Sequence, residues 1–229
     1  MSELLATPAS DGAPAHPGPR TQADRTARAR RRLIQAAIRL LAERGYTGTT
    51  LAEIGREAGL SRGLVTHHFG SKDACIIAAI EEIRATAQRV FQEGAVDGRR
   101  GLARIDNLIA MYIGSARGGT QYVRALYVVM ADAISEAPSL REAVAHVNEV
   151  FRSHLRAMLA EAVEDGEIPP DTDLAANAVL VEGLLRGVCL QWFTDPDRVD
   201  LDAAIRAAQH MVRAGLAAPP PPPPRPPPP

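Results

Sequence analysis

The stretch GLSRGLVTHHFGSKDA, residues 59–74, gathers the side chains most able to do chemistry: two adjacent histidines, an arginine and a lysine among three glycines. A metal site would need His67 and His68 on the same side of a helix, but neighbouring helical residues point about 100° apart. The sequence offers no third ligand at a suitable spacing. We therefore expect no metal and no cofactor, and we interpret the stretch as part of a surface that recognises another molecule.

The elements around this stretch predict a helix-turn-helix. Thr50 with Glu53 three residues later is the pattern of a capping box and opens a short helix over residues 50–58. Ser61 caps a second short helix over 62–69. A small apolar core is expected to join these two short helices to a preceding helix over residues 24–44. The two short helices and their turn contribute Leu51, Ile54, Ala58, Leu60, Val65 and Phe69 to this core.

This packing leaves one face of the second helix open, with Arg62, Gly63, Thr66 and His67 on it. These side chains are short or form hydrogen bonds, and Gly63 removes bulk near the start of the helix. Such a face suits the major groove of DNA, which just admits one α-helix. Arg62 could also be an ordinary solvated side chain, but its place in the helix-turn-helix favours a DNA contact.

The neighbouring groups suit phosphates. Thr49, Thr50 and Ser71 stand at helix N-termini, where free amide protons and the helix dipole favour an anion. Lys72 opposes the dipole of its own helix, which is sensible if a phosphate neutralises it, and His68 is expected to anchor the helix or to contact phosphate. An arginine cluster over residues 25–32 can approach the backbone from the flank, although alone it would more often be a solvated face. The predicted DNA-binding residues are Arg28, Thr49, Thr50, Ser61, Arg62, Gly63, Thr66, His67, His68, Ser71 and Lys72.

The charge distribution agrees with one basic end. Residues 1–72 carry eleven Lys and Arg against six Asp and Glu, whereas the remainder carries fifteen against twenty-one. This asymmetry predicts that only the N-terminal part meets a polyanion. Cys75 and Cys189 lack metal-ligand spacing and are expected to be reduced core residues. No signal-peptide pattern and no apolar run of about 18 residues is present, so we predict a cytoplasmic protein without membrane contact.

The rest of the chain is also predicted to be helical. Of its 229 residues, 46% are hydrophobic and only 4% aromatic, which favours packed helices over a sheet. A long helix is expected to start at Ser71, and further helices follow over 99–116, 120–134, 138–165, 172–194 and 200–215. The predicted all-α chain divides into a disordered tail (1–22), a helix-turn-helix domain (23–72), a helical body for ligand binding and dimerisation (73–217) and a polyproline tail (218–229).

Apolar stripes on the last two helices suggest a dimer interface. Steps of three and four residues separate the predicted interface residues, which are Val181, Leu185, Val188, Leu201, Ile205 and Val212. Paired across a two-fold axis, these helices would form a four-helix interface, and Gly183 and Gly187 would allow close approach. Alternatively, both stripes are buried in the core of their own chain.

Several residues of the body are candidates for a ligand pocket, although such residues are more often plain core. They are Met111, Tyr112, Arg124, Tyr127, Phe151 and Trp192. Arg124 could meet an anion or form a surface ion pair. A box of aromatic rings around a quaternary ammonium also stays open, because nothing in the sequence brings the rings together.

The stretch TTLAEIGREAGLSRGLVTHHFGSKDACIIAA resembles the DNA-binding segment of the TetR family of bacterial transcription regulators. The shared pattern comprises Thr50, Ile54, Ala58-Gly59, Ser61-Arg62-Gly63, His68-Phe69 and Lys72, and the similarity extends over residues 28–88. Thr66 replaces the usual tyrosine of the recognition helix, which puts the identity of the bases read in doubt. The run GLVTHHF and residues 183–197 are similar to the BetI-like branch, which regulates osmoprotectant metabolism.

The resemblance implies an all-α homodimer with two DNA-binding heads on a ligand-binding body. We expect a transcription regulator, a repressor that a small-molecule effector releases from a palindromic double-stranded operator. The alternative is a DNA-bound regulator controlled by a protein partner, whose body would be too tightly packed to hold a metabolite. We expect no enzyme, because the sequence shows no P-loop, no dinucleotide fingerprint and no nucleophile motif.

Overall fold

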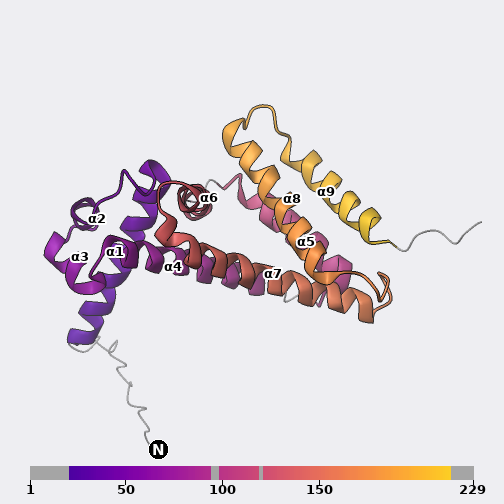
Figure 1. Ribbon diagram of the computed structural model, residues 1–229, viewed down its shortest axis with the longest axis horizontal. Helices are drawn as coiled ribbons and strands as arrows, with labels where there is room; N and C mark the ends of the chain where they lie inside the picture. The colour runs from indigo at the N-terminus through magenta and orange to yellow at the C-terminus, as the bar shows by residue number, and fades with distance from the viewer. Residues whose placement is uncertain (1–20, 94–97, 119–120, 218–229) are drawn as a thin grey trace, which may run out of the picture.

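The computed structural model describes residues 21–93, 98–118 and 121–217, and throughout these ranges the secondary structure is helical, without a strand (Figure 1). The elements are α1 (Gln22–Arg44), α2 (Leu51–Glu57), α3 (Arg62–Phe69), α4 (Lys72–Glu93), α5 (Gly101–Ser115), α6 (Gln121–Ile134), the 3₁₀ turn η1 (Pro138–Leu140), α7 (Arg141–Glu164), α8 (Leu174–Thr194) and α9 (Leu201–Leu216). The all-α prediction is therefore confirmed.

The helices α2 and α3 start at the capping residues predicted for them, Thr50 and Ser61. The Thr50 side chain accepts a hydrogen bond from the Glu53 amide at 3.2 Å, and the Glu53 carboxylate accepts one from the Thr50 amide at 3.0 Å. Asp173 and Asp200 cap α8 and α9. Thr21 caps α1 in the same way, so α1 begins at Gln22, two residues before the helix predicted over residues 24–44. Residues 1–20 of the predicted disordered tail and the polyproline tail lie outside the described residues.

The apolar side chains form two clusters along the molecule. The first joins α1, α2 and α3 to the start of α4, to α6 and to the start of α7. The second joins α5, α8 and α9 to the later part of α7. Figure 1 shows α4 and α7 running side by side from the helix-turn-helix toward α8 and α9. The small head is therefore packed on the body rather than tethered to it.

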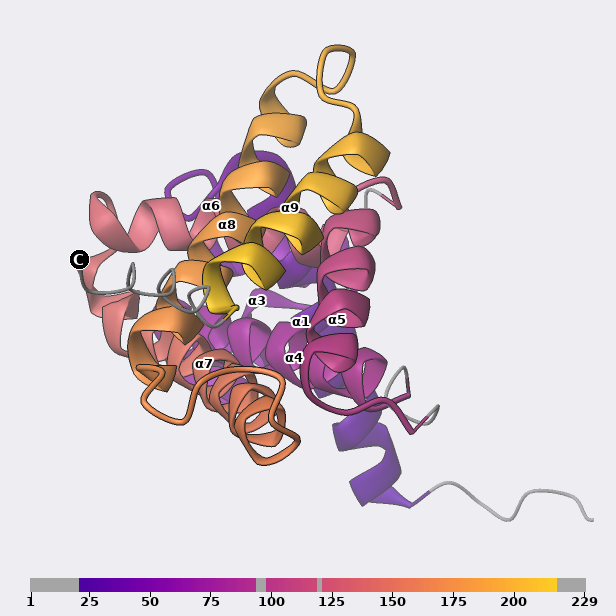
Figure 2. The ribbon, with the colours of Figure 1, turned by 90° about the vertical axis from the view of Figure 1, so that its right-hand side faces the viewer.

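The residues predicted for the dimer interface lie in the core of their own chain, which corrects that prediction. Val181, Leu185, Leu201 and Val212 are buried in the second cluster, and Val188 and Ile205 pack against it. The competing interpretation, burial in the chain's own core, holds for both stripes. The two stripes face this core because α7 packs against α8 and α5 packs against both α8 and α9. Figure 2 shows how these helices are arranged.

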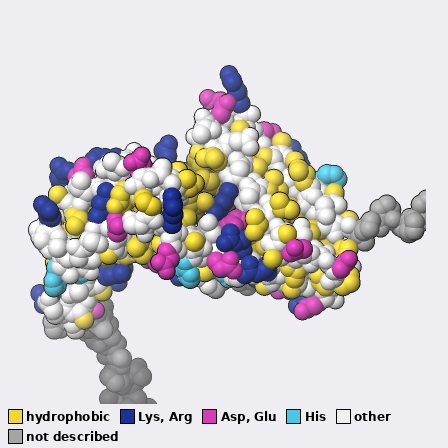
Figure 3. All heavy atoms as spheres, viewed as in Figure 1, with side chains coloured by type: hydrophobic (Ala, Val, Ile, Leu, Met, Phe, Trp, Pro, Cys, Tyr) yellow, Lys and Arg dark blue, Asp and Glu magenta, His cyan; other side chains and the backbone are white. Residues whose placement is uncertain are grey.

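A second apolar face of α8 and α9 points away from the core, and Figure 3 shows hydrophobic side chains at the surface over this part of the molecule. Its large side chains are Val179, Leu180, Leu190 and Met211, of which Leu180 is 67% exposed. By length and composition α8 could also cross a membrane. However, it packs against α5, α7 and α9 and carries the ion pair Glu182–Arg186, so core packing accounts for its inner face. What covers the outer face is taken up below.

Candidate DNA-binding surface and ligand cavity

Close backbone contacts hold α2 and α3 together. The Leu60 amide donates a hydrogen bond to the Gly55 carbonyl at 2.7 Å, and a Cβ at Gly55 would lie only 2.9 Å from the Leu60 carbonyl oxygen. Gly59 turns the chain with φ of 64°, a left-handed conformation that favours glycine. With Ile54 and Val65 fully buried, α3 has one fixed orientation on α2.

The outer face of α3 carries the residues predicted for it. Arg62, Gly63, Thr66 and His67 are all exposed. A Cβ at Gly63 would meet nothing nearer than the Ser61 hydroxyl oxygen at 3.8 Å. The Thr66 hydroxyl donates a long 3.3 Å hydrogen bond to the Arg62 carbonyl, so a stronger acceptor could readily replace this bond. The face is smooth and open to a groove.

Serine side chains mark both ends of this face. The Ser61 hydroxyl oxygen accepts a hydrogen bond from the Leu64 amide at 3.2 Å, and the Ser71 hydroxyl oxygen accepts one from the Ala74 amide at 3.1 Å. Both serines are exposed and retain a hydroxyl proton for a phosphate. Thr50 differs, because its hydroxyl already donates to the Glu53 carboxylate at 2.8 Å.

The prediction that Thr49 contacts DNA is also corrected by the structure. It is fully buried, its hydroxyl donates to the Gly45 carbonyl at 2.7 Å, and its amide donates to the Tyr46 carbonyl at 3.1 Å. Both of its donors are therefore used inside the protein. Thr49 shapes the turn between α1 and α2, and the neighbouring Thr50 takes the N-terminal position of α2.

The arginines of α1 differ in what they contact. Arg32 donates to the Ala58 carbonyl and so caps the end of α2. The Arg30 guanidinium lies 5.4 Å from the Phe69 ring centroid and braces α3. Arg28 is exposed and faces solvent, as a phosphate contact requires.

Lys72 and His68 lie at the seam between α3 and α4. The Lys72 ammonium lies 3.7 Å from the centroid of the Tyr46 ring, and burial lowers its pKa. Burial also lowers the pKa of His68, with the neighbouring His67 and Arg30 adding to the effect. Burial and the neighbouring His67 and Arg30 therefore favour the neutral form of His68. The Tyr46 ring holds the Lys72 ammonium in place.

Tyr46 also joins the head to the body, a role that the sequence did not suggest. Its amide donates to the Asp132 carboxylate of α6 at 2.7 Å, and its hydroxyl donates to the Asp73 carboxylate of α4 at 2.5 Å. The Tyr46 hydrogen bond holds the pKa of Asp73 below its usual value, and Asp73 raises that of Tyr46. The end of α1, the start of α4 and α6 thus meet at one residue.

Replacing Asp132 with alanine is expected to loosen this junction. The half-buried Tyr46 amide would lose its acceptor, so the free energy of unfolding should fall by about 1–3 kcal/mol, with faster hydrogen exchange at that amide. Asp202→Ala is a matched control, since it breaks the exposed ion pair with Arg117 and should cost less than about 1 kcal/mol. Equal losses for the two variants in urea denaturation would contradict the role of Asp132.

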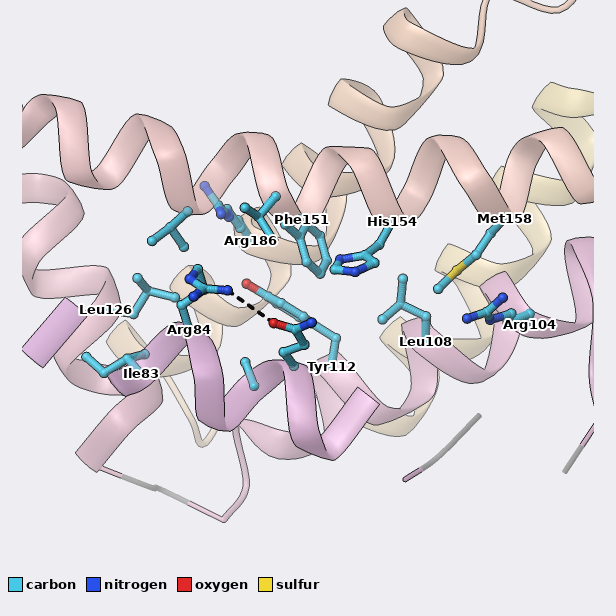
Figure 4. A pocket seen from close by; sticks show the side chains of 14 residues that line it. Ile83, Arg84, Arg104, Leu108, Tyr112, Leu126, Phe151, His154, Met158 and Arg186 are labelled. Carbon is cyan, nitrogen blue, oxygen red and sulfur yellow. Dashed lines mark hydrogen bonds between the residues drawn. The ribbon is translucent and has the colours of Figure 1, made fainter. Parts of the chain in front are cut away.

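A cavity of about 200 Å³ lies between α4, α5, α6, α7 and α8 (Figure 4). Apolar side chains form most of its wall, and the polar ones are Arg84, Gln88, Arg104, Tyr112, His154 and Arg186. The apolar ones include Leu108, Val147, Phe151 and Met158. A mostly apolar wall with a few polar groups is typical of a small-molecule site.

The structure brings together only part of the predicted pocket. Tyr112 and Phe151 line the cavity, and the Tyr127 hydroxyl lies behind them, 3.4 Å from that of Tyr112. Met111, Arg124 and Trp192 are not part of the wall. Arg124 is exposed, and the Trp192 ring packs against Phe193 and the second apolar cluster.

The described residues contain no group of three or more His, Cys, Asp or Glu that could hold a metal ion. Burial raises the pKa of the Cys75 and Cys189 thiols to about 12 and about 11. Both cysteines are buried core residues, and a thiol that stays protonated is a poor nucleophile.

Two family models match most of the chain. One, described as bacterial regulatory proteins of the tetR family, matches residues 33–79. The other, described as the C-terminal region of BetI-type transcriptional repressors, matches residues 102–217. Residues 80–101, which neither model covers, include the later part of α4.

Individual proteins show the same similarity. The chain is 32% identical over 167 residues to the HTH-type transcriptional regulator BetI of Burkholderia thailandensis, covering 69% of this chain and 80% of that protein. A TetR-family regulator from Cytophaga hutchinsonii superposes with a TM-score of 0.71 at 18% identity, over 84% of this chain and 96% of that one. The regulator FadR of Bacillus subtilis, solved in complex with stearoyl-CoA, superposes with a TM-score of 0.68 at 18% identity, over 81% and 98%.

Proposed function

Because this chain belongs to the TetR family of bacterial regulatory proteins, we propose that it represses transcription by binding a palindromic operator as a homodimer. In this proposal residues 23–72 form the DNA-binding head and residues 73–217 the body, and the protein acts in the cytoplasm as a regulator and not as an enzyme. The open face of α3 carries the proposal, since it is smooth, exposed and flanked by capped helix ends.

In the proposed complex α3 enters the major groove. Thr66 and Arg62 reach base edges, while Gly63 lets the helix backbone approach the groove wall. Ser61, Ser71 and Arg28 contact phosphates, which position the helix without reading sequence. His67 lies at the edge of the groove, and Lys72 and Thr50 add positive charge and amide donors nearby.

The outer face of α8 and α9 is the proposed dimer interface. It carries the exposed side chains of Val179, Leu180, Leu190 and Met211. A Cβ at Gly183 or Gly187 would meet nothing within 4 Å, so the backbone of α8 is bare at the middle of this face. A second copy packed here would bury the apolar surface and set two α3 helices on two half-sites, about 34–36 Å or a multiple apart.

A small molecule in the cavity is the proposed effector. The wall includes Ile83 and Arg84 of α4 and Leu126 of α6. Both helices contact the head, α4 through Asp73 and α6 through Asp132. A ligand that favours one tilt of α4 would therefore change the separation of the two heads, and a coupling of about 1–3 kcal/mol suffices. The complex of FadR with stearoyl-CoA supports ligand control, and the cavity counts against the alternative of a tightly packed, partner-controlled body.

Binding to DNA from upstream of the protein's own gene tests this function. Fragments are compared at two salt concentrations for the wild type, for Thr66→Ala and for Thr172→Ala, a control whose hydroxyl also bonds a nearby carbonyl, 2.7 Å away. We expect selective, salt-sensitive binding by the wild type and the control. Thr66→Ala should lose about 1–3 kcal/mol of preference for its target. Absence of DNA binding at low salt would refute the proposal.

A further inference from the structure

Three arginines face the cavity, Arg84 from α4, Arg104 from α5 and Arg186 from α8. His154 of α7 adds an imidazole ring to the wall. Among the described residues of the wall no side chain is acidic. In the view of Figure 4, Arg84 and Arg186 lie toward one end and Arg104 toward the other, with Tyr112, Phe151 and Leu108 between them.

Acidic residues behind the wall hold these arginines in place. Arg104 Nη1 lies 2.8 Å from Glu161, and Arg84 Nε lies 2.8 Å from Glu81. Neither glutamate lines the cavity. The carboxylates therefore fix the guanidinium groups from outside the wall, and Arg84 Nη1 also donates to the Gln88 side chain at 3.1 Å (Figure 4).

Arg186 shares its acid with another arginine. Its Nη2 lies 2.6 Å from the buried carboxylate of Glu182, which also lies 3.4 Å from Arg152. Arg152 also pairs with Glu149 at 3.3 Å, and Glu149 pairs with Arg156 at 2.6 Å. Two carboxylates thus serve three guanidinium groups, so this network carries excess positive charge. A buried cation without full compensation is costly and attracts an anion.

Two arginines of the wall each keep a buried donor without an acceptor. The Nε groups of Arg104 and Arg186 are buried and form no hydrogen bond within the described part of the chain. A buried N–H group without a partner costs free energy that a suitable acceptor recovers. A carboxylate is such an acceptor, and its bonds to guanidinium groups are charge-assisted.

We infer that the cavity takes a small organic carboxylate with an apolar body, and this inference rests on the cavity being the effector site of the proposed function. The carboxylate would pair with the arginines, and the apolar body would lie against Phe151, Leu108 and Met158. A quaternary ammonium fits poorly, because the described wall presents guanidinium groups and no acidic side chain. The wall also offers only two aromatic rings for a cation, those of Tyr112 and Phe151. The aromatic box left open by the sequence is therefore not favoured.

Matched probes test the sign of the charge. Calorimetry on the full chain without DNA compares octanoate, 1-octanol and octyltrimethylammonium below their micelle-forming concentrations, and 4-phenylbutyrate provides an acid with a ring. We expect at least one acid to bind about tenfold or more tightly than the alcohol, with no binding of the ammonium. If the alcohol or the ammonium binds as tightly as the acids, or if neither acid binds, the inference is wrong.

Arginine variants test the contact. Arg104→Gln should weaken acid binding about five- to tenfold, and Arg104→Lys should weaken it less, since it keeps the charge. Arg117→Gln removes an arginine paired with Asp202 outside the cavity and should leave binding unchanged. Equal affinities of all variants would overturn the inference. Operator binding without probe is measured in parallel, so that a protein that binds acid but no DNA refutes the proposed function alone.

Discussion

A leucine in place of Gly63 is expected to leave the protein folded and to weaken selective operator binding at least a hundredfold. The space around a Cβ at Gly63 is open within the chain, with only the Ser61 hydroxyl oxygen at 3.8 Å. Glycine is also the weaker helix former, so the substitution should not destabilise α3. Any loss must then arise from the groove wall, where an added side chain of four carbons would push the backbone of α3 away from the bases.

A matched pair of smaller substitutions separates these two effects. Gly63→Ala and Gly114→Ala each add one methyl group to a helix at a position without close contacts. Both should raise the free energy of unfolding, by up to about 1 kcal/mol. Only the variant at Gly63 should bind operator more weakly. If Gly63→Leu binds the operator as the wild type does, α3 does not approach the groove by this face.

The head could be predicted because its determinants are local. A threonine with a glutamate three residues later, or a serine before a short apolar run, fixes a helix start within four residues, and the structure shows these caps at Thr50 and Ser61. By contrast, only tertiary contacts distinguish the roles of residues of the same type. Nothing nearby in sequence indicates that Arg32 caps α2 while Arg28 stays exposed, or that Thr49 turns inward beside the outward Thr50.

The cavity was only partly predictable because its polar wall comes from distant helices. Arg84, Arg104 and Arg186 lie far apart in sequence and meet only through the packing of α4, α5 and α8. In the sequence each of these arginines has an acidic residue within four positions, so each could form an ordinary surface ion pair. Aromatic residues looked like the better candidates, yet of those only Tyr112 and Phe151 reach the wall.

The helix α8 shows why periodicity selected a stripe that belongs to the chain's own core. It is apolar on two faces, and a helix of that kind has no polar side to mark the direction of solvent. The more regular stripe, with Val181 and Leu185, packs against the body of its own chain. The less regular face, with Leu180 and Leu190, remains exposed. Sequence spacing detects both faces but does not say which one belongs to the chain itself.

Arginine at Leu180 should therefore convert the proposed dimer into folded monomers. Leu180 is 67% exposed in the single chain, so the substitution costs little in the monomer. In the dimer the new charge would be buried between two apolar faces without a partner, twice over because the interface is symmetric. Light scattering should show the monomer mass, and operator affinity should fall at least a hundredfold, because each head alone holds only one half-site.

Two further variants give this result its meaning. Ile134→Arg places the same charge on another exposed apolar residue, at the end of α6, and should leave both the mass and the operator affinity unchanged. Leu185→Ala removes a fully buried side chain of the same helix and should instead lower the free energy of unfolding by about 2–5 kcal/mol. Dimers of Leu180→Arg with normal operator affinity would show that the protein pairs through another surface. The exposed face of α8 would then not be the dimer interface, and Leu180 and Leu190 would have to contact another molecule or remain in solvent.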